Sequence, residues 1–483
     1  MRVSLHQTWR ARHPIFTLRP ARRVFIHFRS FVPGADAVQD NGVMRHTHSL
    51  RGAAWVVGYL VFVLAPLFAL LTGAVGPARD FWTEFSAALG YAGLAMMGLQ
   101  FGLTARFRWV TEPWGEDVLY HLHRQLSLVA VALVIAHPVI LFMVRPELLD
   151  LLNFVDAPWR ARFAALSMAS LLVLLATSLW RARLRIRYET WHHLHVVLAV
   201  AAVVTGLLHM VGWGFYLTDP WKRALWIALT VFWIGLLVHV RVIRPLFMLR
   251  KPYTVTEVRA ERGDTTTLRM EPDGHDGFRF VPGQFGWLTV WGSPFGITGH
   301  PFSFSNSAET GDGSVEMSIR RLGDFSGRVG EIPVGRRVYV DGPYGAFTIG
   351  HPADMHVLIA GGVGITPMMS IVRTLADRHD DRPVVLLYGA TDWESITFRE
   401  ELDEVAGRLA LNTVHVLTDP PSGWDGEQGF ITADVLRRHV APPYGEHEYF
   451  ICGPPPMMDA MEAALRELDV PMSKYHSERY SFA

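Results

Sequence analysis

The sequence predicts a multidomain membrane protein in which a six-helix transmembrane bundle precedes an antiparallel β-barrel and an α/β domain with a parallel sheet. Three observations lead to this expectation. Half of the 483 residues are hydrophobic, yet 19% are charged, and this mixture suggests a membrane part joined to a soluble part. Six long apolar segments lie before residue 244. After Pro252 the long apolar segments end. Short runs that alternate apolar and polar residues come first, and segments typical of strands and helices in turn follow them.

The six apolar segments each have about the length needed to cross roughly 30 Å of hydrocarbon. We expect a membrane domain over residues 52–248, with helices at about 53–75, 84–105, 119–143, 163–180, 192–213 and 221–243. Before them, residues 1–51 carry nine arginines and no long apolar run. This stretch does not look like a cleavable secretory signal, so we expect a basic cytoplasmic tail.

Basic residues predict the orientation of the helices. They concentrate after the second, fourth and sixth segments, at Arg106, Arg108, Arg181, Arg183, Arg185, Arg187, Arg241, Arg244, Arg250 and Lys251. The other connections hold fewer bases, which acids partly offset. Because basic loops stay in the cytoplasm, we expect a multi-pass protein of the cell inner membrane with both termini cytoplasmic.

Two pairs of histidines lie within the apolar segments. His123 and His137 lie in the third segment and His195 and His209 in the fifth, and each pair is 14 residues apart. At about 100° and 1.5 Å per residue, this interval brings two side chains to nearly the same helix face, roughly 21 Å apart along the axis. Side by side, the helices offer His123 with His195 near the cytoplasmic face and His137 with His209 near the outer face. Each site could bind an iron from both sides, as in bis-imidazole haem ligation.

Membrane histidines can also have a purely structural role. A single membrane histidine can be a hydrogen-bonded packing residue, but ionisable groups in spans are costly and usually functional, and four at matched spacing favour haem ligands. His121, His192 and His193 lie at helix entrances, where an interfacial or propionate-contacting role is open, and His239 is expected to be structural. The single cysteine, Cys452, excludes an intrachain disulfide and an all-cysteine iron–sulfur site. A formal net charge of zero gives no argument for nucleic acid as a partner.

Residues 252–350 and 351–483 are expected to form two soluble domains. The first contains TVTEV, TTTLRM and WLTVW with turn residues between them, a pattern typical of a small antiparallel barrel. The second alternates apolar strands, such as HVLIA and PVVLLYG, with helical patterns. That alternation indicates a parallel sheet with crossover helices.

Two motifs in the last domain follow predicted strands. AGGVGITPMMS (360–370) follows HVLIA and precedes a helix, so its glycines let a pyrophosphate approach the backbone at a helix start. CGPPPMM (452–458) follows EYFI, at the carboxyl edge where such sheets bind ligands. A tight turn and a proline-rich loop are the alternative interpretations.

Three motifs in the barrel domain could bind a ligand. HPFSFSN (300–306) alternates aromatic rings with hydroxyls, which suits a planar ring with polar atoms along its edge, although an ordinary strand has the same pattern. RRLGDFS (320–326) places arginines beside a glycine turn, where they could bind a diphosphate. DGPYG (341–345) is expected to be a turn that closes the barrel and touches the ligand.

Taken together, these features resemble the ferric reductase/NADPH oxidase superfamily, which joins a ferric-reductase-like transmembrane domain to a ferredoxin-NADP-reductase-like FAD and nicotinamide module. The LHR…HP and LH…LH histidine pairs are similar to its haem helices. HPFSFSN is similar to its flavin motif, and GGVGITP and CGPPPMM are similar to its nicotinamide motifs. The resemblance covers about residues 50–483.

The resemblance implies which residues hold cofactors. The four histidines would bind two b-type haems, and the soluble motifs would bind FAD and either NADPH or NADH. An aromatic residue near the C-terminus would stack on the flavin where nicotinamide enters, with Phe482 the better candidate and Tyr480 the second. The candidate catalytic residues are Phe482 and Cys452. The implied cofactor-binding residues are His300, Pro301, Phe302, Ser303, Ser305, Arg320, Gly323, Ser326, Gly361, Gly362, Gly364, Thr366, Pro367, Cys452, Gly453 and Pro454.

The implied function is electron transfer from cytoplasmic NAD(P)H through FAD and two haems to an extracytoplasmic acceptor. Oxygen-reducing members place an arginine and an extra histidine beyond the outer ligand, whereas this chain has Leu141 there and no arginine in the second segment. Ferric chelates are therefore favoured over oxygen. The outer loops carry carboxylates that could attract a cation, although as solvated loop charges they need no such role: Glu147, Asp150, Asp156 and Asp219. Asp392 favours NADH, although Arg399 is near enough in sequence to reverse this.

Two other classes of protein are disfavoured, and the sequence predicts no particular oligomeric state. A quinol-linked haem subunit that serves a partner protein is disfavoured because the donor domains are already fused to the chain. An ion channel or transporter is disfavoured because the polar residues of the spans are mainly the matched histidines, without a repeat of broken helices.

Overall fold

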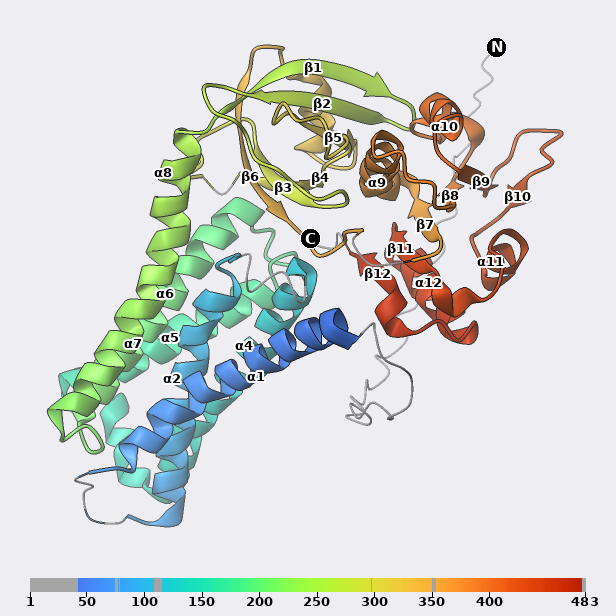
Figure 1. Cartoon of the computed structure of the whole chain (residues 1–483). Helices are drawn as coiled ribbons and strands as arrows, with labels where there is room; N and C mark the ends of the chain where they lie inside the picture. The colour runs from blue at the N-terminus through green and yellow to red at the C-terminus, as the bar shows by residue number, and fades with distance from the viewer. Residues whose placement is uncertain are drawn as a thin grey trace, which may run out of the picture. The chain divides into compact units, whose positions relative to one another are not determined.

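The computed structural model describes residues 42–73, 77, 79–107, 115–296, 298–349 and 353–479. Within this range, the chain from His48 onward forms one compact unit (Figure 1). The predicted basic tail lies almost entirely outside the described residues, and so do Tyr480 and Phe482.

Six long apolar helices make up the first half of the unit, as predicted. They are α1 (Gly42–Leu70), α2 (Phe81–Leu103), α4 (Glu116–Val144), α5 (Trp159–Leu179), α6 (Tyr188–Trp213) and α7 (Pro220–Val238). In the part of the chain that the structure describes, all six are long and apolar enough to cross a membrane. Several begin before the predicted apolar run, because polar turns such as YETW at the start of α6 continue the helix.

Close packing holds the helices in two main pairs. α2 packs along α4, and α5 packs along α6. Small residues allow this, since a Cβ on Gly93 would lie 2.5 Å from Val134 of α4, and one on Gly212 would lie 2.1 Å from the Trp159 ring of α5. α4 and α6, which carry the histidine pairs, are thus held by separate neighbours.

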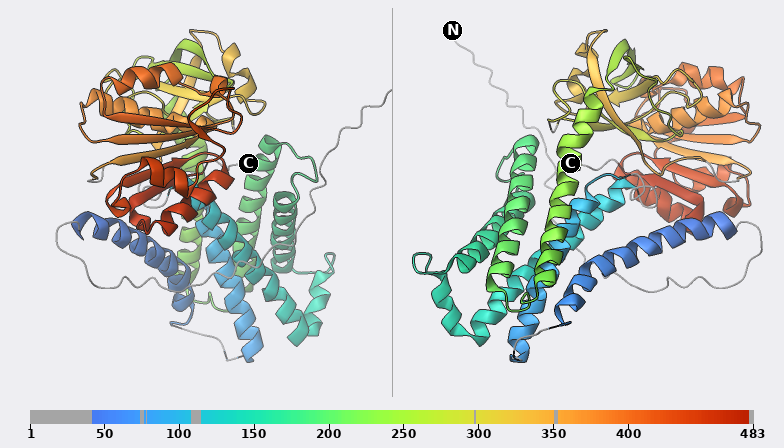
Figure 2. Two further views of the ribbon diagram at one scale, coloured as in Figure 1. Left: turned by 90° about the vertical axis from the view of Figure 1, so that its right-hand side faces the viewer. Right: turned by 60° about the vertical axis from the view of Figure 1, so that its left-hand side comes forward.

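The last span runs directly into the soluble half. α7 continues through a π-helical turn (His239–Ile243) into α8 (Arg244–Leu249), and the stretch Pro220–Leu249 is 30 residues long. At about 1.5 Å per residue this helix extends roughly 45 Å. Its two ends therefore mark opposite ends of the bundle (Figure 2).

An antiparallel barrel follows α8. Its strands are β1 (Tyr253–Glu261), β2 (Thr265–Pro272), β3 (Phe285–Thr289), β4 (His300–Ser303), β5 (Val315–Arg320) and β6 (Arg337–Tyr344). The order is β4-β3-β6-β1-β2-β5, and a bridge between Phe304 and Met317 joins the two edges. The predicted turn at 341–345 is mostly strand, because Asp341 and Tyr344 pair with β3.

The last part is a parallel sheet of β7 (His356–Gly361), β8 (Val384–Ala390), β9 (Leu411–Leu417), β10 (Glu427–Gln428), β11 (Glu448–Cys452) and β12 (Tyr475–Glu478). Its order is β10-β9-β8-β7-β11-β12. One buried cluster packs α9 (Ile365–Asp377) and α10 (Arg399–Ala406) on one face, and another packs α11 (Ala433–His439) and α12 (Pro455–Glu467) on the other (Figure 2). The strand order changes direction between β7 and β11, which is where such sheets bind ligands.

Polar bonds from α9 join this sheet domain to the barrel. Ser370 donates to the carbonyl of Asn306 at 2.8 Å, and Arg373 donates to that of Ser305 at 2.7 Å and forms an ion pair with Glu401. These contacts are largely buried, so they fix the first helix of the sheet domain against the flavin-motif segment of the barrel.

Candidate functional site

The four membrane histidines meet in the two predicted pairs. The ring centres of His123 and His195 are 6.3 Å apart, and those of His137 and His209 are 6.4 Å apart. Since an imidazole nitrogen binds a metal at about 2.0–2.1 Å and lies roughly 1.1 Å from its own ring centre, two rings that face one metal have centres roughly 6.3 Å apart. Both pairs therefore have the spacing of two imidazoles bound to one metal ion.

Each pair offers only two protein ligands. Among the described residues, no group of three or more His, Cys, Asp or Glu side chains gathers in a metal-binding arrangement. A metal held by two imidazoles needs its other ligands from a non-protein group, and the haem macrocycle supplies four nitrogens. The donor set fits haem better than a bare metal ion.

Hydrogen bonds orient the outer pair. Nδ1 of His137 donates to the carbonyl of Ser86 at 2.8 Å, and Nδ1 of His209 donates to the carbonyl of Arg160 at 2.9 Å. The Ser86 hydroxyl donates in turn to the His137 carbonyl at 2.7 Å. A proton fixed on Nδ1 leaves Nε2 free to bind a metal.

The inner pair is held more weakly. Nδ1 of His195 lies 3.2 Å from the Ser178 hydroxyl, whereas Nδ1 of His123 is buried without a hydrogen-bond partner among the described residues. Of the other histidines, His192 contacts Arg241, and the ring of His239 lies 5.5 Å from that of Phe107. The structure therefore does not bring these last two into either pair.

The predicted flavin motif lies on β4, beside β3. Ring contacts join His300 to Phe325 at 4.1 Å and Phe302 to Phe325 at 5.7 Å. Pro301 pairs with Trp287 of β3. The Ser305 hydroxyl is buried and accepts a hydrogen bond from Ser318 at 3.0 Å, so it faces the barrel interior. Sequence reasoning did not single out Phe325, although it lies within RRLGDFS.

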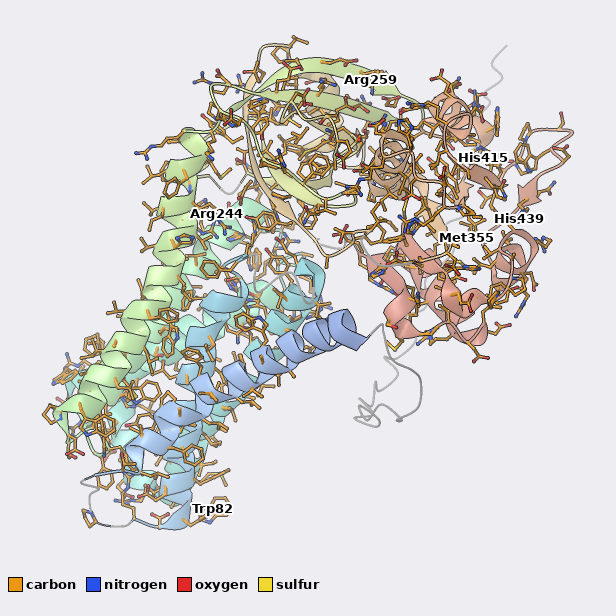
Figure 3. The ribbon with its side chains drawn as sticks, viewed as in Figure 1. Trp82, Arg244, Arg259, Met355, His415 and His439 are labelled. Atoms are coloured by element: carbon orange, nitrogen blue, oxygen red, sulfur yellow. The ribbon has the colours of Figure 1, made fainter. Side chains whose placement is uncertain are left out.

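A cluster of charges, with Glu116 buried and the others half-buried, joins the barrel to the inner ends of the helices. Trp287 donates to Glu116 at 3.3 Å, and the guanidinium of Arg106 lies 3.5 Å from a Trp287 ring centre. Arg244 of α8, labelled in Figure 3, pairs with Asp341 at 3.6 Å. Burial raises the pKa of the Glu116 carboxyl, and the Arg106 charge acts in the opposite direction.

This cluster brings the flavin-motif strands to the histidine helices. Glu116 begins α4 and precedes His123 by seven residues, which is about 10 Å along a helix. Burial lowers the pKa of His300, and the charge of Glu189, in the first turn of α6, raises it. The starts of both histidine helices therefore lie near β3 and β4.

Arg320, at the end of β5, is free to bind an anion. Its guanidinium forms no hydrogen bond or ion pair with any described residue and lies 3.0 Å from where a Cβ on Gly362 would be. The hydroxyl of Ser326 accepts bonds from the backbone N–H groups of Leu322 and Gly323, both at 2.9 Å. An unpaired arginine between the barrel and the glycine loop suits a diphosphate.

The two nucleotide motifs lie side by side at the carboxyl edge of the sheet. Cys452 pairs with Ala360 across β11 and β7. A Cβ on Gly364 would lie 2.1 Å from the Cys452 carbonyl oxygen, and one on Gly361 would lie 2.8 Å from Pro454. Gly361 and Gly364 are thus required because a side chain at either position would collide with the neighbouring loop. This requirement is separate from the space that a bound phosphate would need near the backbone.

Cys452 and Thr366, both predicted to bind a cofactor at the carboxyl edge of the sheet, are buried. Burial raises the pKa of Cys452 well above its ordinary value, so the thiol stays protonated. The Thr366 hydroxyl donates to the Ser318 carbonyl at 3.2 Å, so it also helps to join the sheet domain to the barrel.

The residues that bear on coenzyme choice follow β8. Asp392 accepts a hydrogen bond from the Ser395 N–H at 2.8 Å. Arg399 donates to the Trp393 carbonyl at 2.9 Å and pairs with Glu400 at 3.1 Å. Its guanidinium is therefore already bound, while Asp392 lies at the end of the second strand.

Comparisons with known proteins match both the membrane part and the soluble part of the chain. The family "Ferric reductase like transmembrane component" matches residues 89–206, and "Oxidoreductase NAD-binding domain" matches residues 358–463. NADH-cytochrome b5 reductase 1 of Aspergillus clavatus is 30% identical over 206 residues, which are 40% of this chain and 67% of that protein.

Two further similarities cover the soluble half. The reductase component of propane 2-monooxygenase from Rhodococcus jostii is 32% identical over 238 residues, 47% of this chain and 62% of that protein. The FAD/NAD-binding domain of nitric oxide dioxygenase from Vibrio cholerae is 24% identical with a TM-score of 0.42, and the match covers 47% of this chain and 97% of that one.

The chain is a ferric reductase transmembrane component fused to an NAD-binding oxidoreductase module of the ferredoxin reductase type. It is thus a multi-pass, NAD(P)H-driven oxidoreductase with six candidate spans, an antiparallel FAD domain and a parallel-sheet NAD-binding domain.

Proposed function

We propose that this protein transfers electrons from cytoplasmic NADH through FAD and two b-type haems to a ferric chelate on the opposite side of the inner membrane. The observation that carries the proposal is the pair of ring distances, 6.3 and 6.4 Å, between histidines on α4 and α6. His123 and His195 hold the inner haem, and His137 and His209 hold the outer one. The domain boundaries at 52–248, 252–350 and 351–483 are part of this proposal.

When bound, FAD would supply the conversion from a two-electron hydride donor to single-electron transfer, and haem would supply one-electron carriers. The chain's own residues bind and orient these groups. His300, Phe302 and Arg320 hold the flavin and its diphosphate, and the loop from Gly361 to Pro367 with Cys452 to Pro454 holds the dinucleotide. Phe482 lies outside the described residues, and its proposed role is the one that the family resemblance implies, stacking on the flavin where nicotinamide would enter. Because its thiol is buried and protonated, Cys452 lines the site and is not a nucleophile.

NADH is the favoured coenzyme. The carboxylate of Asp392 repels a 2′-phosphate, and Arg399 is engaged with Trp393 and Glu400. The name of a relative, NADH-cytochrome b5 reductase 1, agrees with this choice.

Oxygen is the alternative acceptor. Leu141 follows the outer ligand by one turn, and the second span contains no arginine, so the pattern of the oxygen-reducing members is missing there. The basic connections after the second, fourth and sixth spans support a cytoplasmic flavin module and an outer acceptor.

The test is turnover of the purified protein with FAD and NADH. Anaerobic NADH oxidation with ferric citrate, with little superoxide formed in air, supports the ferric reductase. If turnover requires oxygen, and superoxide dismutase abolishes the reduction of added cytochrome c, the protein is an oxidase instead.

A further inference from the structure

A cavity lies at the end of the bundle remote from the barrel. Its volume is about 510 Å³, and its lining includes Arg160 at the start of α5, Trp213 at the end of α6 and Arg223 near the start of α7. The start of α2, with Trp82 labelled, lies at the same end of the bundle (Figure 3). The cavity is a largely open depression, and its volume is within the range of small-ligand pockets, about 300–1,000 Å³.

The cavity adjoins the outer histidine pair. The carbonyl of Arg160 accepts the hydrogen bond from Nδ1 of His209 at 2.9 Å. Trp213 follows His209 by four residues, one turn further along α6. The pocket lining therefore includes one residue that is hydrogen-bonded to His209 and one that follows it by a helical turn.

Neither arginine of the cavity has a counter-ion among the described residues. The Arg160 guanidinium lies 4.8 Å from a Trp213 ring centre, and its Nε is buried without a hydrogen-bond partner. Arg223 donates to the Leu217 carbonyl at 2.5 Å. Neither forms an ion pair with any residue that the structure describes, so both charges are available to an anion.

The carboxylates of this end are largely engaged elsewhere. Asp219 pairs with Lys222 at 3.2 Å, Glu147 pairs with Arg145 at 2.7 Å, and Asp156 accepts from Asn153 at 2.8 Å. α5 and α7 also begin here, and helix starts carry partial positive charge. The local field therefore favours an anion, and these carboxylates act as engaged loop charges, which is one of the two interpretations that the sequence left open.

We propose that this cavity is the acceptor site and that it binds ferric iron as an anionic, carboxylate-bearing chelate through Arg160 and Arg223. The inference rests on the proposed function and adds the substrate's charge class and its site. The reaction balances, because NADH gives two electrons, two ferric chelates take one each and become ferrous, and NAD⁺ and one proton are released.

A haem propionate is also a carboxylate, so the arginines could bind either a propionate or the ferric chelate. The experiment must distinguish these two ligands. Arg160→Gln and Arg223→Gln each remove one charge from the cavity. Arg145→Gln is the matched control, because it removes one charge from the same end of the bundle outside the cavity lining. All variants are first checked for haem content and for anaerobic haem reduction by NADH.

The expected result is a KM for ferric citrate that rises about tenfold in each cavity variant, with the KM for the cationic acceptor hexaammineruthenium(III) unchanged. The control variant behaves as wild type. Added salt raises the KM for ferric citrate only. If instead Arg160→Gln changes haem content or the haem midpoint potential while the KM stays constant, the arginine serves a propionate and the proposal is wrong.

A second measurement does not depend on turnover or on a variant. Redox-inert gallium(III) citrate is tested by equilibrium dialysis against the purified wild-type holoprotein, and saturable binding that salt weakens is expected. Absence of binding overturns the site. If gallium citrate binds but NADH never reduces the haems, the proposed function fails while the anion site stands.

Discussion

The contact between the two nucleotide loops makes Gly364→Ala a sharp test of the nucleotide site. Gly364 has φ −60° and ψ −8°, which alanine adopts easily, so only space opposes the change. The new Cβ would lie 2.1 Å from the Cys452 carbonyl oxygen and 2.5 Å from its carbon, and ordinary contact begins near 3.4 Å. Both atoms are backbone, so the Cys452–Pro454 loop must move by about 1.3 Å. Overpacking of this kind costs about 1–3 kcal/mol, and we expect the upper end.

The assay combines thermal unfolding of the FAD-loaded protein with stopped-flow reduction of the flavin by NADH. We expect Gly364→Ala to lower the unfolding temperature and to raise the NADH concentration needed for half-maximal flavin reduction at least fivefold, while haem reduction by dithionite is unchanged. Gly407→Ala is the matched control, since its Cβ would lie 3.4 Å from the Glu404 carbonyl. If the two variants behave alike in both assays, the close contact between the loops is not real.

Two further predictions concern charge. Because burial raises the folded-state pKa of Glu116 above its ordinary value of 4.5, wild type should lose stability relative to Glu116→Gln as pH rises from 4.5 through that folded pKa, by at most about 1.4 kcal/mol per pH unit. Unfolding at pH 5 and pH 8 in detergent measures this, and a stability difference independent of pH would contradict it. Asp392→Asn keeps a capping side chain and removes the charge, so the KM for NADPH should fall about fivefold or more with stability unchanged. An unaltered NADPH preference would show that Asp392 does not face the coenzyme.

The histidine pairs were predictable because helical periodicity and membrane length both act locally along the sequence. Their orienting partners were not, since the carbonyls of Ser86 and Arg160 lie 51 and 49 residues from the histidines they bind. Backbone carbonyls carry no sequence signal. For the same reason nothing in the sequence indicated that Trp287 meets Glu116, 171 residues away.

The parallel sheet was predictable where strands are continuous apolar runs, as in β7 and β8. Two strands were missed. β10 has two residues, and β12 reads YHSE. Each lies at an edge of the sheet, where pairing with one neighbour defines the strand and burial does not impose an apolar pattern.

The most direct test of the whole account is the haem content of the purified protein and of its single-histidine variants. Wild type should hold two low-spin haems per FAD, both reduced by NADH without oxygen. His137→Leu and His123→Leu should each retain only one, because each removes a ligand from one pair. A wild-type protein with fewer than two haems, or a variant that keeps both, would contradict the assignment of the two pairs.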